Sequence, residues 1–266
     1  MTILFLYILG RSPNADNIEC MVPYQASDTV TFFGPCLKPL RERLRNHYLK
    51  ASDDYLLPGN EKAFVVGVNG GNRQHNRKIV WAGRITRVMT FETAYNDLTT
   101  SEFQEMRSHP LSPLHVRPLS GDGDSFVGYE RISGLHKDCW ASDVTKHQGL
   151  QTRLDGKRLY LVPGANRSKV FTLDCCFLCD NIFFARGVGI RITEEMLDLL
   201  QKAQPDKTID TYAIFGYCAN RSVNGRRGHY LEMCGELAES FIGLIRASTP
   251  PSPHPPASPS RLKPCC

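Results

Sequence analysis

The sequence has no apolar run of the ~20 residues that a membrane-spanning helix needs. Its most apolar stretch, MTILFLYIL, covers residues 1–9 only. This stretch has no basic leader, and Gly10-Arg11-Ser12-Pro13 follows it instead of a small-residue cleavage site. We therefore expect a first core strand, no membrane partner, and a soluble, cytoplasmic protein.

The motifs of several large enzyme classes are also absent. The chain holds no G-x-S-x-G nucleophile elbow, no H-E-x-x-H zinc motif, no Walker A sequence and no dinucleotide-binding fingerprint. Asn69-Gly70-Gly71-Asn72 is rich in glycine, but no helix is predicted after it, so we interpret it as a hairpin tip. We assign no catalytic residues.

A strong charge imbalance is missing as well. The chain has 32 Lys and Arg against 27 Asp and Glu, which gives a formal net charge of +5. The pI is about 8.7. Such a balance permits a nucleic-acid partner without requiring one.

Paired zinc knuckles are missing, although the chain has ten cysteines. One C-x-x-C lies within Cys175-Cys176-Phe177-Leu178-Cys179, with Cys218, His229 and Cys234 downstream as possible further ligands. Structural zinc usually takes two such pairs. The apolar residues inside the motif suit a buried strand, so we expect core thiols and neither a metal nor a cofactor, with zinc as the alternative.

The sequence does contain enough apolar residues, 41% of 266, for a sizeable core. From residue 248 the composition changes, since seven of the last 19 residues are proline. Such a segment is typical of a disordered or polyproline tail. We expect one α+β domain over residues 1–247 and a disordered Pro/Ser-rich tail over residues 248–266.

Hydrophobic periodicity predicts both strands and helices. The expected strands are residues 1–9, 29–33, 63–68, 78–89, 158–162, 170–173, 180–185 and 211–217. The expected helices begin near Pro39, over residues 90–106 in two pieces, over residues 193–203 after a Thr193 cap, and over residues 234–247. Ser101 and Gln104 occupy capping-box positions in the second of these helical regions.

The chain is organised around residues 63–95, where two apolar strands flank a basic loop. This pattern predicts a hairpin. Both faces of the second strand carry apolar side chains, so we expect it inside a sheet or barrel. Arg73, His75, Arg77 and Lys78 beside the loop suit either a solvated surface or contacts with a phosphate backbone.

Two further groups of side chains have alternative interpretations. In the first predicted helix Leu40, Leu44 and Tyr48 form an apolar stripe, and Arg41, Arg43 and Arg45 lie off it, as a solvated face or as a phosphate-facing surface. The only tryptophans are Trp81 and Trp140. Either one is a core residue or a platform on which a base stacks.

The hairpin resembles the PUA-like superfamily, which includes EVE, YTH and ASCH domains. Val80, Ala82, Gly83, Ile85 and Val88 fill the second-strand pattern of that superfamily. The chain is also similar to the nucleotide-modification-associated domains, in which an N-terminal strand, a Cys-Lys-Pro-like segment before an arginine, and a strand-Gly-strand unit follow in order. Residues 6–9, 36–41 and 63–89 correspond to these parts, with Leu37 as an insertion.

The resemblance implies a small PUA-like mixed β-barrel with surrounding helices, which binds a modified base of a nucleic acid or nucleotide in a pocket at the barrel mouth. Trp81 would stack on the base, Asn69 would hydrogen-bond its edge, and Lys38 and Arg84 would hold phosphate. The full set of implied site residues is Cys36, Lys38, Asn69, Trp81, Arg84, His115 and Trp140.

Two alternatives belong to other functional classes. One is an enzyme that acts on a nucleotide or modified base, with His115, His136 and Cys139 in a loop over the pocket. The other is an interaction protein whose fold serves as a scaffold.

Overall fold

The computed structural model describes residues 2–9, 23–34, 37–69, 77–109, 112–120, 126–131, 139–141, 175–185, 189–211, 213–215, 217–218, 221–222 and 230–249. Helices and strands are both present in these ranges, so the expected mixture is confirmed. None of the described helices is long and apolar enough to span a membrane.

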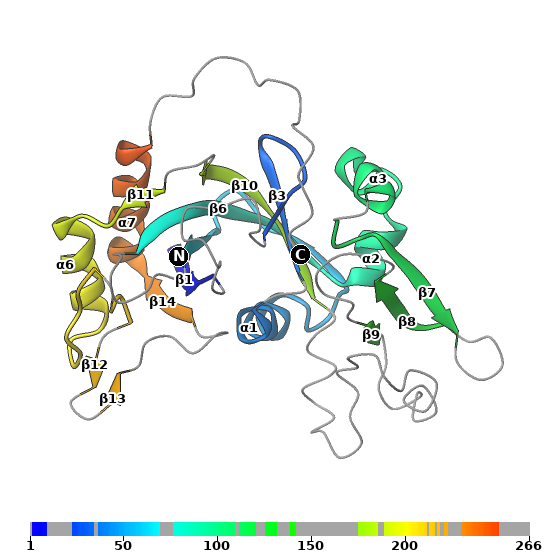
Figure 1. The fold of residues 1–266 in the computed structure, drawn as a ribbon. Coiled ribbons are helices and arrows are strands. Elements are labelled where there is room, and N and C mark those ends of the chain that lie inside the picture. Colours follow the sequence, from blue (N-terminus) through cyan, green and yellow to red (C-terminus); the bar gives the residue numbers. More distant parts are fainter. Residues whose placement is uncertain are drawn as a thin grey trace. The chain divides into compact units, whose positions relative to one another are not determined.

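Helices lie between groups of strands along the described chain (Figure 1). The helices are α1 (Lys38–Tyr48), α2 (Phe91–Asn96), α3 (Ser101–Ser108), α6 (Glu194–Ala203) and α7 (Gly235–Ser248). The strands are β1 (Thr2–Ile8), β2 (Tyr24–Gln25), β3 (Val30–Phe33), β4 (Asp54–Leu56), β5 (Lys62–Val68), β6 (Lys78–Met89), β7 (Val116–Ser120), β8 (Phe126–Arg131), β9 (Cys139–Ala141), β10 (Cys176–Phe184), β11 (Ile190–Arg191), β12 (Tyr217–Cys218), β13 (Arg221–Ser222) and β14 (Tyr230–Cys234).

Nine strands form one sheet, in the order β14-β1-β5-β6-β10-β3-β2, with β4 and β11 paired to β6 outside this path. Strand β1 is parallel to β5 and antiparallel to β14. The order of the described strands is that of an open sheet, and a closed small barrel is not among the arrangements they show. Smaller sheets join β12 to β13, and β7 to β8 to β9.

The chain divides into two compact units, each built from separate segments. Unit 1 contains Met1–Val22, Leu57–Thr86 and Cys179–Lys263, and unit 2 contains Pro23–Leu56, Arg87–Leu178 and Pro264–Cys266. Strands β6 and β10 therefore contribute residues to both units. The single domain expected over residues 1–247 stays a prediction.

In unit 1 the first strand is the core strand that the sequence predicts. Six of the seven residues of β1 are buried, between β5 on one edge and β14 on the other. Helix α7 packs against β1 and β14, and α6 packs against α7. The side chains that α7 buries are Ala238, Phe241, Ile242 and Ile245.

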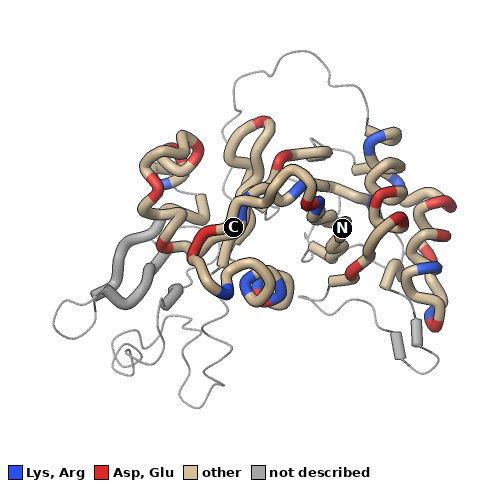
Figure 2. The backbone as a smooth tube through the Cα atoms, turned by 180° about the vertical axis from the view of Figure 1, so that it is seen from behind, with Lys and Arg blue, Asp and Glu red and all other residues tan. Residues whose placement is uncertain are grey.

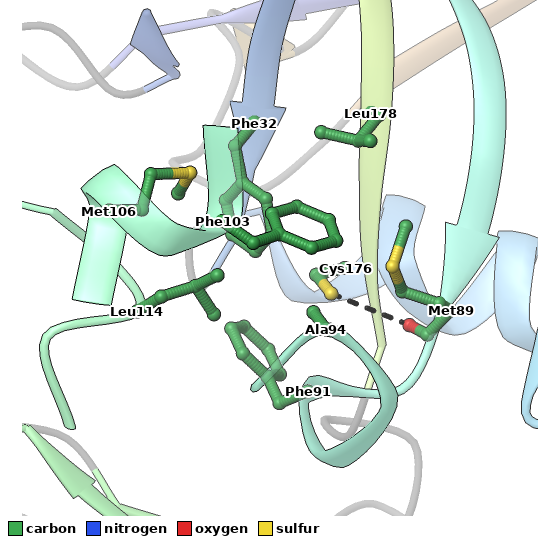
Figure 3. Packing of buried hydrophobic residues seen from close by; sticks show 9 residues of the cluster. All are labelled: Phe32, Met89, Phe91, Ala94, Phe103, Met106, Leu114, Cys176 and Leu178. Carbon is green, nitrogen blue, oxygen red and sulfur yellow. Dashed lines mark hydrogen bonds between the residues drawn. The ribbon is translucent and has the colours of Figure 1, made fainter. Parts of the chain in front are cut away.

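In unit 2 a core cluster joins three strands of the sheet, β3, β6 and β10, to helices α2 and α3 (Figure 3). Phe32 of β3 meets Phe91 and Phe103 edge to face, with ring centroids 6.1 and 6.0 Å apart. Cys176 of β10 directs its thiol to the Met89 carbonyl at 3.5 Å. The other members are Ala94, Met106, Leu114 and Leu178.

Of the helix N-termini predicted from capping residues, that of α6 is confirmed and that of α3 is not. The Thr193 hydroxyl accepts a hydrogen bond from the Met196 amide at 3.3 Å, and α6 ends at Ala203 as expected. The capping box predicted from Ser101 is wrong, because the N-cap of α3 is Thr100 and its side chain makes no cap hydrogen bond.

Some strand predictions differ from the structure or lie outside it. The strand expected over residues 211–217 is wrong, because residues 213–215 form no strand and β12 begins only at Tyr217. The strands expected over residues 158–162 and 170–173 lie outside the described residues, as does the predicted tail from residue 250 onward.

Candidate functional site

The predicted hairpin is confirmed, and its neck is closed by polar contacts. Strands β5 and β6 pair antiparallel, with Phe64 opposite Arg84. The Asn69 side-chain oxygen accepts a hydrogen bond from the Lys78 amide at 2.8 Å, and Arg77 donates to the Asn69 carbonyl at 3.0 Å. Asn69 and Arg77 are 5% and 4% exposed. The Asn69 acceptor, predicted to bind a base edge, thus holds the neck together.

Trp81 lies in the core of unit 1. Its side chain is 1% exposed, its indole nitrogen donates to the Asn181 side chain at 3.3 Å, and its ring meets that of Tyr7 edge to face at 6.3 Å. Of the two interpretations of Trp81, this arrangement is core packing. A base could stack on the indole only if these neighbours moved away.

Arg84 keeps hydrogen-bonding capacity. Its side chain is half-buried, and one terminal nitrogen donates to the Gly59 carbonyl at 3.4 Å. Its Nε is buried without an acceptor among the described residues. The buried Nε is out of reach of a ligand, so Arg84 stays a candidate phosphate ligand in unit 1 through its terminal nitrogens alone.

The other predicted site residues are not brought together by what the structure describes. Cys36 lies outside the described residues, and for Lys38 in α1 and Trp140 in β9 only the backbone is described. His115 contacts the Arg107 carbonyl through Nδ1 at 2.9 Å. His136 is outside the described ranges and Cys139 has only its backbone there, so the enzyme alternative stays a prediction.

The cysteine motif lies on a buried strand, as the core-thiol interpretation predicts. Cys175, Cys176 and Cys179 are free and buried. Burial, and secondarily the carboxylate of Asp180, raises the pKa of the Cys179 thiol. No group of three or more His, Cys, Asp or Glu side chains suited to a metal occurs within the described part of the chain.

Helix α1 in unit 2 has a basic composition, with Lys38, three arginines and His47 against a single acidic residue, Glu42. Figure 2 shows it at the lower centre, where Lys and Arg cover much of the helix. Leu40, Leu44 and Tyr48 are buried as expected. Arg41 was expected off this stripe but is 1% exposed, and it donates to the Cys175 carbonyl at 3.0 Å.

The basic residues beyond Arg41 remain accessible. Arg43 and Arg45 are half-buried, and His47 and Lys50 are exposed. Residues four apart in a helix lie on one face with Cβ atoms about 5–6 Å apart. Arg43 and His47 therefore lie on one face of α1, and Lys50 follows directly after the C-cap Leu49; we call these three residues the α1 stripe.

A second surface of unit 2 is acidic. An open pocket of 430 Å³ is lined by Asp53, Thr90, Glu92, Thr93, Asn96 and Asp97. Burial, with the neighbouring charge of Asp53, raises the pKa of Glu92. This charge disfavours phosphate, so the pocket does not compete with the α1 stripe for an anionic ligand.

Sequence reasoning missed a charged network at the end of β6. Arg87 makes two hydrogen bonds to Asp54, of 2.8 and 2.7 Å, and one to Asp97 of 2.6 Å. The partners are 33 and 10 residues away in sequence. No short-range spacing signals such a network, although Arg87 on a strand with both faces covered indicates a need for acidic partners.

No family model matches the chain, and neither a curated protein nor a solved structure gives a match. The resemblance to the PUA-like superfamily therefore stays a prediction from the sequence.

Proposed function

We propose that this protein binds nucleic acid or a nucleotide, and that the α1 stripe contacts its phosphates. The observation that carries the proposal is the accessible basic set of Arg43 and His47 on one face of α1, a helix with one acidic residue, and Lys50 just after its C-cap. Lys and Arg contacts to phosphates release condensed counterions and supply most of the sequence-independent affinity for nucleic acid. Because the pocket of the same unit is lined by acidic residues, we assign the phosphate contacts to the basic surface of α1.

The alternative without a function in binding is that the α1 stripe is simply a solvated helix face. Basic residues in a last turn also complement the helix dipole, and Arg45 and His47 occupy that turn of α1. The dipole accounts for charge near the C-terminus but not for Arg43 in the middle of the helix. The two explanations differ in salt dependence, because only phosphate contacts give affinity that falls with salt.

The PUA-like resemblance adds a finer proposal, a modified base held at a barrel mouth in a cytoplasmic protein. In this proposal Arg84 holds phosphate through its terminal guanidinium nitrogens. Trp81 stacks only after leaving its place beside Tyr7 and Asn181. Titration of plain and modified oligonucleotides that differ in one base tests this part separately from general binding.

The test of the main proposal is the salt slope of binding. We would measure the Kd of a fluorescent oligonucleotide by anisotropy between 50 and 200 mM salt, roughly the range in which phosphate contacts dominate. Changing Arg43→Gln together with Lys50→Gln should reduce the magnitude of the slope by about 1.4 to 1.8, since each lost contact removes about 0.7 on single strands and 0.9 on duplexes.

Lys202→Gln is the matched control for charge. Lys202 is exposed in the last turn of α6 in unit 1, so its loss should leave the slope unchanged. Absence of binding to any oligonucleotide, or an equal effect of the control, would contradict the proposal.

A further inference from the structure

His47 differs from Arg43 and Lys50 of the α1 stripe because its charge depends on pH. The imidazole of a histidine gains or loses its proton between about pH 5 and 8, whereas lysine and arginine stay cationic there. His47 lies in the last turn of α1 and is exposed. The number of cations that the stripe offers to a phosphate therefore depends on the proton of His47.

The imidazole of His47 is held on one side, and its nitrogens are available. It meets the ring of Tyr48 edge to face, with centroids 4.5 Å apart and planes 85° apart. Tyr48 is buried and itself stacks on Tyr55 of β4 at 5.1 Å. Within the described part of the chain, His47 makes no hydrogen bond and no ion pair. Its nitrogens can therefore bind a ligand without first breaking such a contact.

Within α1, His47 shares its face with a cation. Arg43 lies one turn before it on the same face, and Lys50 follows three residues after it. Arg45 and the acidic Glu42 precede His47 by two and five residues, which places them about 160° and 140° away around the helix axis. On this helix a protonated His47 therefore faces a cation and not a carboxylate.

The elements beside α1 bring no carboxylate into ion-pair contact with His47. Strand β4 reaches α1 through Tyr55, while the carboxylate of Asp54 is held in the network at the end of β6. Asp53, just before β4, lines the acidic pocket. The segment before β10 reaches α1 through the carbonyl of Cys175, whose thiol is buried. Among the described residues, a protonated His47 thus has no counter-charge at ion-pair distance.

This arrangement couples the proton of His47 to a bound phosphate. Like charges four residues apart in a helix repel each other, so a protonated His47 is disfavoured by Arg43 as long as the stripe is empty. A phosphate that contacts both side chains replaces this repulsion with two attractions. Protonation then favours phosphate binding, and bound phosphate favours protonation to the same extent.

We infer that pH regulates the affinity of the α1 stripe for phosphate, with protonated His47 as an additional phosphate contact. The inference rests on the proposed function and adds its regulation. The step moves one proton from solvent to the imidazole and changes no other bond. Arg43 and Lys50 supply the contacts that persist at high pH, and His47 adds one as the pH falls.

The experiment measures the Kd of labelled dT12 for the full chain by anisotropy, over a salt series at about pH 8 and at about pH 5.5. The dye and thymine are chosen because neither titrates in this range. The salt slope of the wild type should be steeper by about 0.7 at the lower pH, the value of one contact on a single strand. Counted from 1 M, this slope corresponds to about 5-fold tighter binding at roughly 0.1 M salt.

Two variants of His47 with fixed charge bracket the wild type. His47→Gln has no cation at either pH, so at both it should show the slope of the wild type at the higher pH. His47→Lys has one at either pH, so at both it should show the slope of the wild type at the lower pH. A merely structural role of His47 would shift the two variants alike.

His109→Gln is the control for loss of a histidine. His109 lies in the same unit, away from α1, beside Tyr24 at a ring distance of 5.9 Å. This variant should keep the pH dependence of the wild type.

The outcomes separate the two proposals. The inference is overturned if the slope of the wild type is the same at both pH values, if His47→Gln keeps the pH dependence, or if His109→Gln removes it. In these cases a slope that depends on Arg43 and Lys50 leaves the proposed function standing. If the wild type binds no oligonucleotide at either pH, the proposed function fails, and the inference fails with it.

Discussion

Arg87 of unit 2 is held by contacts on several sides. Its side chain is 15% exposed, that of Asp97 is 9% exposed, and both are held in short ion pairs. Its guanidinium also lies 5.9 Å from the centroid of Phe103. Removing one partner from such a network leaves buried charge without compensation, which costs more than the pair itself contributes.

We expect Arg87→Met to lower the free energy of unfolding by about 3 kcal/mol, because Asp54 and Asp97 lose their counter-charge. Urea denaturation measures the change. Lys62→Met is the matched control: the Lys62–Glu239 pair is 3.5 Å long with side chains 52% and 53% exposed, and exposed pairs contribute at most about 1 kcal/mol. Similar losses in both variants would show that burial does not govern the network.

The same network predicts a dependence of stability on pH. Burial raises the pKa of Asp97, but hydrogen bonds from Thr99, Arg87 and Thr100 lower it more, so the net pKa lies below the ordinary 3.8. A carboxylate with a depressed pKa stabilises the folded state above its unfolded pKa, and this stability is lost as the pH falls through the folded value.

Asp97→Asn should therefore be less stable than the wild type at pH 6, and the difference should shrink as the pH is lowered from about 4 towards 2. Urea unfolding at a series of pH values checks this. A difference that stays constant over the series would mean that the charge of Asp97 does not stabilise the fold.

For single residues, the sequence predicts which residue types enter the core but hardly which other residues they contact. Trp81 occupies the same position in the alternating strand pattern whether it packs in the core or stacks on a base. Only the placement of Tyr7 and Asn181 decides between these two roles. Arg41 shows the same limit, because its burial depends on the Cys175 carbonyl, 134 residues away in sequence.

Among the helices, α6 is predicted best, because its N-cap residue, its acidic first turn and its hydrophobic periodicity all indicate the same helix. Thr193 accepts the Met196 amide, and Glu194 and Glu195 occupy the first turn. An acidic first turn and a hydroxyl cap satisfy donors that a helix leaves unpaired. Such local agreement needs no knowledge of the rest of the fold.

Thr193→Ala should destabilise the protein by about 1 kcal/mol, the usual cost of a lost N-cap. Thr193→Ser keeps the hydroxyl and should be close to neutral. Thermal or urea unfolding compares the two, and the cap assignment would be refuted by equal stability of the alanine and serine variants.

The failed strand over residues 211–217 shows why apolar content alone misleads. Ala213, Ile214 and Phe215 are buried, but they lie in a turn held by polar side chains. Gln204 donates to the Ile214 carbonyl at 3.0 Å, and the Asp210 carboxylate accepts the Ala213 amide at 2.6 Å. A short apolar run is compatible with strand or buried turn until its hydrogen-bond partners are known.

For the whole molecule, we expect the last helix to contribute much to the free energy of unfolding and the predicted tail to contribute nothing. Helix α7 buries four apolar side chains in unit 1. At about 1.5–3 kcal/mol for each large one, their loss rivals the whole stability of an ordinary domain, about 5–15 kcal/mol.

A chain ending at Cys234 should therefore fail to fold, while a chain ending at Thr249 should keep the wild-type midpoint in a thermal melt followed by circular dichroism. Each truncation serves as the control of the other. A lower midpoint for the chain ending at Thr249 would contradict the sequence prediction that residues beyond 249 lie outside the fold.

The discontinuity of unit 1 has a consequence for the order of events during synthesis. Strand β1 gains its β5 edge once residue 68 has left the ribosome, but β14 on its other edge comes only with residues 230–234. At about 5–20 residues per second, the interval between the synthesis of β5 and that of β14 is roughly 8–33 seconds. Strand β1, of whose seven residues six are buried in the finished protein, thus keeps one edge uncovered during most of the synthesis of the chain, and an uncovered strand edge can pair with another chain.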